Sequence, residues 1–388
     1  MKIALITEHF YPYTGGITEH TFYLAQALAK NHEVFVIAPL YPKVKFVPLP
    51  ERPEFEIVRI GKAGFFPANG SLTAFTYTPS SILTLKRLLK HEKFDVIHIQ
   101  GSVVPTLPFF SALFNVDSVK VVTFHAYHGK STGYSIFKPP LKKALSGIDG
   151  YIAVSFAALI TIQRHFDLEN IKIIPNGVDT NRFTPCGIKL PEFDDGKFNI
   201  LFVGRMEKRK GLQILIEALR GIENKDIRLI VAGDGPLLKK HKKQSERLNI
   251  EVRFLGKVSP HTLASLYRTA SVFVAPSTKG ESFGIVLLEA MASGIPVIAS
   301  SIPGYTETLE EGVYGLIFQN RNPHDLREKI LNVYKNKPLR EKLSAKGLYH
   351  VRSKYSWNKI AEKTEKFYLK LLEGKGPLKE KTKVFDRL

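Results

Sequence analysis

The chain has 388 residues, which is long for one domain and suits two domains of roughly 150–200 residues each. Hydrophobic residues make up 44% and charged residues 24%, as in globular proteins with packed cores, and no apolar run is long enough to cross a bilayer. The single cysteine, Cys186, excludes an internal disulfide and a cysteine-based zinc site.

The charge balance is strongly basic. Lys and Arg together number 56 and Asp and Glu 36, which gives a formal net charge of +20. Such a charge fits a nucleic-acid binder, a protein on an anionic membrane face, or a highly charged stable surface. Net charge alone does not choose between these three interpretations.

The first half of the chain alternates short apolar runs with helical patterns. The run Lys2–Thr7 has the apolar and β-branched composition of a buried parallel strand, and residues 18–30 follow with apolar residues at helical spacing. Further strands are expected at residues 33–38, 94–99, 120–124, 150–154 and 172–174. This is the rhythm of an open parallel sheet with helices on both faces.

The second half repeats the rhythm independently. Strands are expected at residues 199–203, 228–232, 252–255, 272–275, 296–299 and 315–318, with a helix at Leu212–Leu219. Residues 184–197 are rich in Pro, Gly and Asp without periodicity and are expected to form a linker. Residues 325–372 are expected to be helical, and residues 374–388 to form a loose basic tail.

These patterns predict an α/β protein with two Rossmann-like, doubly wound parallel-sheet domains that face a central cleft. The first domain is expected at residues 1–183 and the second at residues 198–357. A helix at about residues 358–372 would then be able to pack back on the first domain.

A loop of glycine and basic residues follows the first strand of the second half, from Gly204 to Gly211. Glycines let the backbone approach a ligand, and the helix start that follows offers free N–H groups. Arg205 and Lys210 add full positive charges, so the loop is typical of a phosphate site. The alternative interpretation is an exposed basic turn.

The most specific pattern contains two glutamates eight residues apart, Glu281 and Glu289. The run 285–298 is so apolar that its helix must be largely buried, and a carboxylate there needs a hydrogen-bonding partner. The hydroxyl pair of a ligand would serve, and the alternatives are a plain N-cap or a buried salt bridge. Glu281 precedes the helix at a strand-to-helix loop, where the amides of Phe283, Gly284 and Ile285 would face the same point.

Together these segments resemble the retaining glycosyltransferases of the GT-B type, in particular the large family 4. Glu281 and Glu289 are similar to the E-x7-E signature of that family. The other matching motifs occur in the order of the family: Pro12 to Gly16, Asp95-Val96-Ile97-His98, Thr123-Phe124-His125, Ile174 to Asp179, Gly204-Arg205 with Lys210-Gly211, and Tyr355-Ser356-Trp357. The resemblance runs from about residue 3 to about residue 365, and within the family it is strongest to the phosphatidylinositol mannosyltransferases.

The resemblance implies that the domain at residues 1–183 lies on the acceptor side and that the domain at residues 198–357 binds the nucleotide-sugar. It also implies a role for each matching position. His125 would contact the transferred sugar near the reacting carbon, and the backbone of Gly16 would approach the β-phosphate of the donor. Arg205 and Lys210 would neutralise the diphosphate. The implied catalytic residues are His125, Arg205, Lys210 and Glu281. The implied donor-binding residues are Gly15, Gly16, Gly204, Arg205, Lys210, Lys257, Val258, Glu281, Phe283, Gly284, Ile285 and Glu289.

In this interpretation the two glutamates bind different parts of the donor. Glu281 and the amides after it would hold the hydroxyls of the sugar, and Glu289 would hold the ribose hydroxyls. Lys257 and Val258 lie where the backbone usually reads the base. The family also implies retention of the anomeric configuration, with no metal and no cofactor besides the nucleotide-sugar co-substrate. The sequence has no Asp-x-Asp motif, and Asp194-Asp195 lies in the expected linker.

The implied reaction moves a hexose, with mannose favoured, from a GDP- or UDP-linked donor to a hydroxyl acceptor that can be lipid-linked. Val258-Ser259-Pro260 lacks the acidic residue that the similar mannosyltransferases place after the valine. UDP-glucose and UDP-N-acetylglucosamine therefore stay open as donors. A sugar-nucleotide epimerase of the same fold is a further alternative, and no oligomeric state is indicated.

Residues 130–145 carry four lysines, no acidic residue and the interleaved residues Tyr134, Ile136, Phe137 and Leu141. Basic and aromatic residues together are attracted to an anionic bilayer surface, and Phe46, Phe55, Phe65 and Phe66 are expected to add exposed aromatic rings. We expect a cytoplasmic enzyme that can lie on the inner membrane face; the alternative is a solvated basic loop. Nucleic-acid binding is not expected, because no recognition motif supports it.

Overall fold

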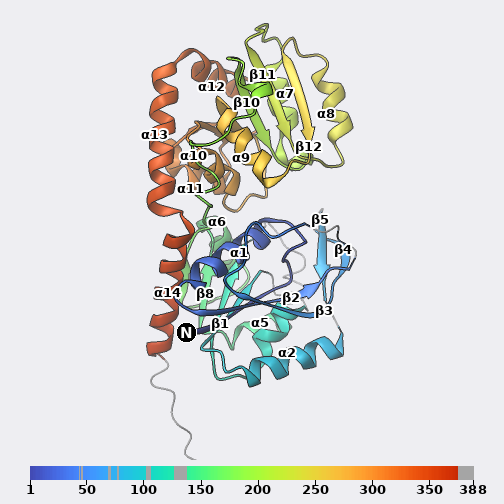
Figure 1. The fold of residues 1–388 in the computed structure, drawn as a ribbon, viewed down its shortest axis with the longest axis vertical. Helices are drawn as coiled ribbons and strands as arrows, with labels where there is room; N and C mark the ends of the chain where they lie inside the picture. Colours follow the sequence, from blue (N-terminus) through green and yellow to red (C-terminus); the bar gives the residue numbers. More distant parts are fainter. Residues whose placement is uncertain are drawn as a thin grey trace, which may run out of the picture.

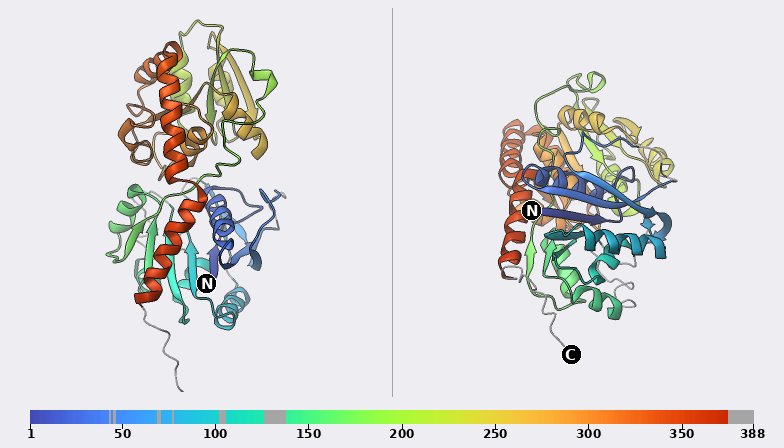
Figure 2. Two further views of the ribbon diagram at one scale, coloured as in Figure 1. Left: turned by 60° about the vertical axis from the view of Figure 1, so that its left-hand side comes forward. Right: turned by 60° about the horizontal axis from the view of Figure 1, so that its bottom comes forward.

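The computed structural model describes residues 1–42, 44, 47–68, 71–76, 78–101, 106–125 and 138–374. Two parallel sheets, each flanked by helices, stand one above the other along the long axis of the molecule (Figure 1). The helices at the end of the chain run down one side of both sheets, as the two further views in Figure 2 also show.

The first sheet has seven parallel strands in the order β3-β2-β1-β6-β7-β8-β9. These strands are β1 (Lys2–Thr7), β2 (Glu33–Leu40), β3 (Glu56–Lys62), β6 (Val96–Gln100), β7 (Val119–Phe124), β8 (Gly150–Ala153) and β9 (Ile171–Ile173). Its helices are α1 (Gly16–Ala29), α2 (Pro79–His91), α3 (Leu107–Leu113), α5 (Lys138–Leu145) and α6 (Phe156–Gln163). A separate antiparallel hairpin is formed by β4 (Gly64–Ala68) and β5 (Ser71–Phe75).

The second sheet has six parallel strands in the order β12-β11-β10-β13-β14-β15. These are β10 (Phe198–Val203), β11 (Ile227–Ala232), β12 (Glu251–Gly256), β13 (Val272–Ala275), β14 (Val297–Ser300) and β15 (Leu316–Phe318). The surrounding helices are α7 (Leu212–Leu219), α8 (Leu238–Ser245), α9 (Pro260–Thr269), α10 (Ile285–Ala292), α11 (Pro303–Thr308), α12 (Pro323–Lys335) and α13 (Lys337–Lys354). Three single turns of 3-10 helix are η1 (Pro191–Phe193), η2 (Lys208–Lys210) and η3 (Glu310–Gly312).

The last helix, α14 (Trp357–Gly374), returns to the first sheet. Trp357 and Tyr368 are buried in the same apolar cluster as Phe22 of α1, and the Trp357 ring stacks on Tyr23 with 5.9 Å between centroids. The last helix of the chain therefore completes the apolar core of the first sheet. The helix buries one mainly apolar face, and its charged residues lie outside that face, as is usual for an amphipathic helix.

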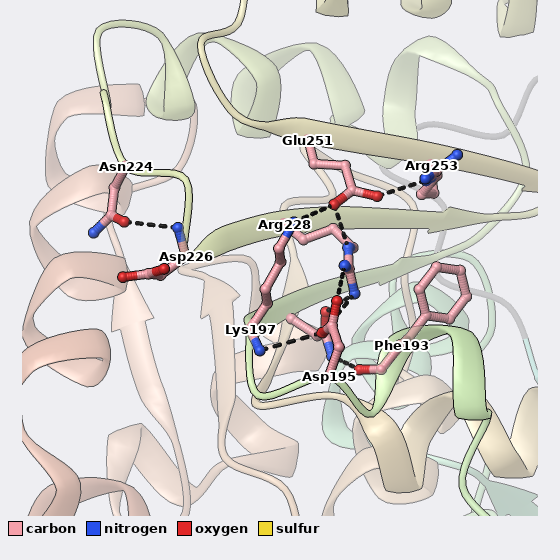
Figure 3. A network of polar contacts seen from close by, with 9 residues as sticks. Phe193, Asp195, Lys197, Asn224, Asp226, Arg228, Glu251 and Arg253 are labelled. Carbon is pink, nitrogen blue, oxygen red and sulfur yellow. Dashed lines mark hydrogen bonds and ion pairs between the residues drawn. The ribbon is translucent and has the colours of Figure 1, made fainter.

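An ion-pair network surrounds the buried Arg228 at the start of the second sheet (Figure 3). Arg228 of β11 is 3% exposed and pairs with Asp195 at 2.5 Å and with Glu251 at 2.9 Å. Lys197 and Arg253 also bond to Glu251, so although burial alone would raise the pKa of Glu251, these bonds lower it to about 2. Asp195 of the predicted linker is thus a structural residue that joins the linker to the sheet.

The prediction of exposed aromatic rings after residue 44 is wrong for Phe55. Its side chain is 7% exposed and packs edge-on against Phe10 and Phe22, because β3 and the loop before it, which the periodicity did not predict, cover the end of α1. Phe65 is half-buried and stacks on Tyr13. Phe46 and the side chain of Phe66 lie outside the described residues.

The predicted membrane segment is described only in its second part. Residues 130–137 lie outside the described residues, and residues 138–145 form α5. In α5, Lys138, Lys142 and Lys143 are exposed, whereas Leu141 is 3% exposed and faces the core. In the portion of the chain that the structure describes, no helix is both long enough and apolar enough to span a membrane.

Candidate active site

Loops at the carboxyl ends of β10, β11 and β13 pack backbone against backbone. A Cβ atom on Gly211, whose φ is +74°, would lie 1.8 Å from the carbonyl oxygen of Pro276. A Cβ atom on Gly233 would lie 2.0 Å from the carbonyl oxygen of Gly204. Only glycine fits at either position, and the result is that the loop 204–211 lies directly beside the loop that leads to Glu281.

This packing brings the predicted Lys210 and Glu281 into contact. The Nζ of Lys210 lies 2.7 Å from Oε1 of Glu281, and the two side chains are only 16% and 13% exposed. Arg209 donates from Nη1 to the same oxygen at 2.7 Å. Arg205, by contrast, is 56% exposed and lies beside Glu207 at 3.2 Å. The site thus has an inner cation pair around Glu281 and an outer arginine at its rim.

Arg209 was not predicted. The sequence signal was present, because Lys208, Arg209 and Lys210 are consecutive basic residues, but their order does not tell which side chains point inward. The 3-10 turn η2 decides this: Arg209 and Lys210 reach Glu281, while Lys208 is exposed. The carbonyl of Arg209 also accepts from the backbone N–H of Thr278 at 2.7 Å, which fastens the two loops together.

Glu289 lies on α10 and, among the described residues, is neither the N-cap of that helix nor part of a buried salt bridge. The N-cap of α10 is Gly284, and in the described part of the chain Glu289 forms no ion pair within contact distance. Its Oε2 accepts a hydrogen bond from the hydroxyl of the buried Tyr267 at 2.9 Å. Burial raises the pKa of Glu289 to about 6, against the opposing effects of the nearby Arg182 and the Tyr267 bond. Tyr267 was missed because it lies on another helix.

The loop between Glu281 and α10 is held rigidly by α11. Gly284 has a φ of +90°, and a Cβ atom there would lie 2.7 Å from the ring of Tyr305. The hydroxyl of Thr308 donates to the carbonyl of Phe283 at 2.5 Å, and a Cβ atom on Gly304 would lie 2.4 Å from the carbonyl oxygen of Glu281. The predicted amides of Phe283, Gly284 and Ile285 are therefore fixed in place before any ligand binds.

On the first sheet, His125 follows β7 at its carboxyl end. Its Nε2 lies 2.9 Å from Oε1 of Gln100, and its ring meets the ring of His20 edge-on at 4.6 Å between centroids. Burial lowers the pKa of His125 well below its usual value, and the neighbouring His20, His98 and His9 lower it further. His125 is therefore neutral near pH 7 and can donate or accept one hydrogen bond without carrying charge.

The two halves of the predicted site touch each other. The hydroxyl of Ser282 donates to the carbonyl oxygen of His125 at 2.6 Å. A Cβ atom on Gly16 would lie 3.8 Å from Cδ1 of Ile285. The structure thus brings Gly16, at the start of α1, and His125 to the loop that carries Glu281. Gly15 is the N-cap of α1 with an extended backbone.

The remaining predicted residues, Lys257 and Val258, stand farther out. They follow β12, which is the edge strand of the second sheet and two strands away from β10. Lys257 is exposed, and Val258 is half-buried against the core. Within the described residues, no group of three or more His, Cys, Asp or Glu side chains is arranged to hold a metal ion.

Both halves of the chain match models of known protein families. Residues 189–348 match the family model for glycosyl transferases group 1, and residues 14–182 match that for glycosyltransferase family 4. The phosphatidyl-myo-inositol mannosyltransferase of Mycobacterium tuberculosis is 33% identical over 381 residues, which cover 95% of this chain and 96% of that protein.

Two solved structures have a similar fold. A glycosyltransferase from Rickettsia africae has a TM-score of 0.74 at 19% identity, covering 96% of this chain and 98% of that chain. The Anabaena protein HepE, in complex with UDP and glucose, has a TM-score of 0.74 at 18% identity, covering 94% of this chain and 98% of that chain.

Proposed function

The chain belongs to the family-4 glycosyltransferases of the GT-B fold and is a glycosyltransferase, and from this premise we propose its reaction. It transfers mannose from GDP-mannose to a hydroxyl group of a lipid-linked acceptor, with retention of anomeric configuration and without a metal ion. Two contacts carry the proposal. Lys210 pairs with Glu281 on the second sheet, and the next residue of the same loop, Ser282, bonds to His125 on the first sheet. The name of the mycobacterial relative supports mannose and a lipid acceptor.

The charges around Glu281 suit a diphosphate donor. Without ligand, the carboxylate of Glu281 is shared by Arg209 and Lys210. A diphosphate would provide Lys210 with a second anionic partner and would attract Arg205 from the rim. The negative charge on the phosphate grows as its bond to the sugar breaks, so these cations would stabilise the transition state more than the ground state. Glu281 would then be free to accept hydrogen bonds from the hydroxyls of the sugar.

The acceptor would enter from the side of the first sheet, where His125 is neutral. Attack on the same face as the leaving phosphate would let that phosphate take the proton of the acceptor hydroxyl. His125 would fix the sugar by one hydrogen bond. A neutral imidazole suits this position, because the sugar gains positive charge as the phosphate leaves and a cation beside it would raise the energy of the transition state.

A nucleotide panel tests the donor. Ligands that bind only the native state raise the melting temperature, so GDP is expected to raise it and UDP to leave it unchanged. A shift with UDP alone would move the proposal to UDP-glucose or UDP-N-acetylglucosamine. No shift with any nucleoside diphosphate would overturn the assignment of the site.

A transfer assay tests the reaction itself. GDP-mannose is supplied with vesicles that contain phosphatidylinositol, and the mannolipid product is analysed by NMR for the configuration at its anomeric carbon. The α-anomer is expected, because retention preserves the configuration of the donor. A β-linked product, a trapped mannosyl–enzyme adduct, or a C2 epimer of the free donor sugar nucleotide would each contradict the proposed mechanism.

A further inference from the structure

The candidate catalytic histidine is connected to the last helix of the chain by a row of buried polar side chains. His98 and Gln100 lie two residues apart on β6 and therefore on the same face of the sheet. The hydroxyl of Tyr368 on α14 lies 2.5 Å from Nδ1 of His98, and Oγ1 of Thr123 lies 2.6 Å from its Nε2. Gln100, with its amide nitrogen 3.2 Å from the His98 ring nitrogens, reaches His125 with its amide oxygen at 2.9 Å.

We propose that Gln100 is a positioning residue that holds His125 as the neutral tautomer protonated on Nε2, and that Tyr368 of α14 steadies this arrangement through His98. The proposal rests on the function given above for His125. It adds two residues, Gln100 and Tyr368, that the sequence motifs do not contain.

The chemistry of the amide decides the tautomer. A glutamine amide has one oxygen that only accepts and one nitrogen that only donates. The oxygen of Gln100 faces Nε2 of His125, so that nitrogen must carry the proton and Nδ1 keeps its lone pair. Gln100, His98, Thr123 and Tyr368 are all no more than 1% exposed, and water therefore cannot replace these partners.

The surroundings also prevent His125 from becoming charged. The groups that face it are His20 of α1, His98 of β6 and His9 after β1, and none is an anion. Gln100 offers an oxygen without a negative charge. A carboxylate at position 100 would instead stabilise the imidazolium form, since an opposite charge at hydrogen-bonding distance favours the charged state.

The position of Tyr368 gives α14 a second role. The helix comes from the far end of the chain, and Tyr368 is separated from His98 by 270 positions in sequence. Its tyrosine hydroxyl contacts the His98 ring together with Thr123 and Gln100. Loss of that hydroxyl would leave Nδ1 of His98 with only the longer contact to Gln100 among the partners named here, and would let the His98 ring, and Gln100 beside it, rotate.

The test is a measurement of the tautomer in the full, ligand-free chain. Two-bond ¹H–¹⁵N spectra of ¹⁵N-histidine-labelled protein report which ring nitrogen is protonated, and a His125→Asn variant assigns the signals. We expect the Nε2-protonated form in the wild type, a mixture in Gln100→Met, and a higher pKa of His125 in Gln100→Glu. Tyr368→Phe is expected to shift the same signals less.

Activity then separates the two proposals. Gln100→Met is expected to lower kcat by about 10 to 10²-fold with little change in KM for the donor, as a misplaced catalytic group does. In Gln100→Glu the acid limb of the pH–rate profile is expected to move to higher pH, and its melting temperature shows whether the fold is intact. An Nδ1-protonated wild type, an unchanged tautomer in Gln100→Met, or an unchanged pKa of His125 in Gln100→Glu would overturn the role of Gln100. A changed tautomer with unchanged kcat would overturn the role of His125 instead.

Discussion

Glu289 is a buried carboxylate at the proposed ribose site. It has one tyrosine hydroxyl as partner and a pKa raised to about 6, chiefly by burial. If its carboxylate accepts the ribose hydroxyls, affinity for GDP is full above about pH 6 and falls as the pH drops through that value. Glu289→Gln should weaken GDP binding by about 10 to 10²-fold and remove the pH dependence. Calorimetric titration across this pH range measures both effects.

The matched control for this experiment is Tyr267→Phe. It removes the hydroxyl that lowers the pKa of Glu289 but leaves the carboxylate in place. The pH dependence should then move to higher pH while binding at alkaline pH stays close to the wild type. Undiminished affinity in Glu289→Gln would mean that the carboxylate does not contact the nucleotide.

Lys210 offers a second test, with a control on the same turn. Lys210 is 16% exposed against Glu281, whereas Lys208, two residues earlier, is exposed. Lys210→Ala should lower kcat by about 10²–10³-fold, the usual cost of removing one donor that stabilises growing negative charge. Lys208→Ala removes the same charge and should leave kcat within about twofold of the wild type. Equal losses in both variants would indicate a general charge effect.

For single residues of the site, the sequence predicted which side chains are present better than it predicted which side chains they contact. Glu281 and Lys210 were both singled out, but the ion pair between them depends on Gly211 and Pro276 packing backbone to backbone, which no spacing encodes. Arg209, Tyr267 and Gln100 were missed for a common reason. Their partners lie on other elements, and only the assembled sheets bring them within hydrogen-bonding distance.

Among the elements, α11 connects the two halves of the molecule. Glu307 accepts hydrogen bonds from the backbone N–H groups of Phe156 at 2.7 Å and Ala157 at 3.3 Å, at the start of α6. A carboxylate at a helix N-terminus is stabilised both by these donors and by the helix dipole. The same helix braces the Glu281 loop through Thr308. The position of α11 therefore links contact between the halves to the geometry of the donor site.

Glu307→Ala should accordingly loosen the contact between the halves. We expect a larger radius of gyration in small-angle X-ray scattering and a lower kcat/KM, while the fold of each sheet persists. Glu310→Ala is the control, because Glu310 lies three residues later and contacts Lys354 at 2.6 Å and His350 at 3.8 Å, which both lie on α13 of the same half. A Glu307 variant with unchanged scattering and unchanged kcat/KM would show that this contact does not hold the halves together.

The sequence predicted strands correctly where their residues are fully buried. The strands β1, β6 and β7 are buried along almost their whole length, and their positions agree with the predicted ones within a few residues. β3 was missed because it is only half-buried and carries charged residues, and the β4–β5 hairpin because it stands outside the main sheet. The helical region after residue 325 divides at Asn336, whose side chain caps α13 by accepting from the N–H of Leu339.

For the whole molecule, the net charge of +20 is the feature that bears on where the enzyme works. The described part of the predicted membrane segment presents Lys138, Lys142 and Lys143 but turns Leu141 into the core. Binding by this helix would therefore be electrostatic and without apolar insertion. Such attraction amounts to about 1 kcal/mol for each basic residue near an anionic surface and is screened by salt.

We therefore expect co-sedimentation with vesicles that contain phosphatidylinositol, little with neutral phosphatidylcholine vesicles, and release as salt is raised. Replacing the three lysines of α5 by alanine should reduce binding by about 10 to 10²-fold. The control replaces Lys239, Lys240 and Lys243 of α8, which are equally exposed and remove the same charge from the other half of the molecule. If both triple variants lose binding equally, the net charge attracts the vesicle without orienting the enzyme. A selective loss in α5 would place the first sheet, and with it His125, on the side of the lipid acceptor.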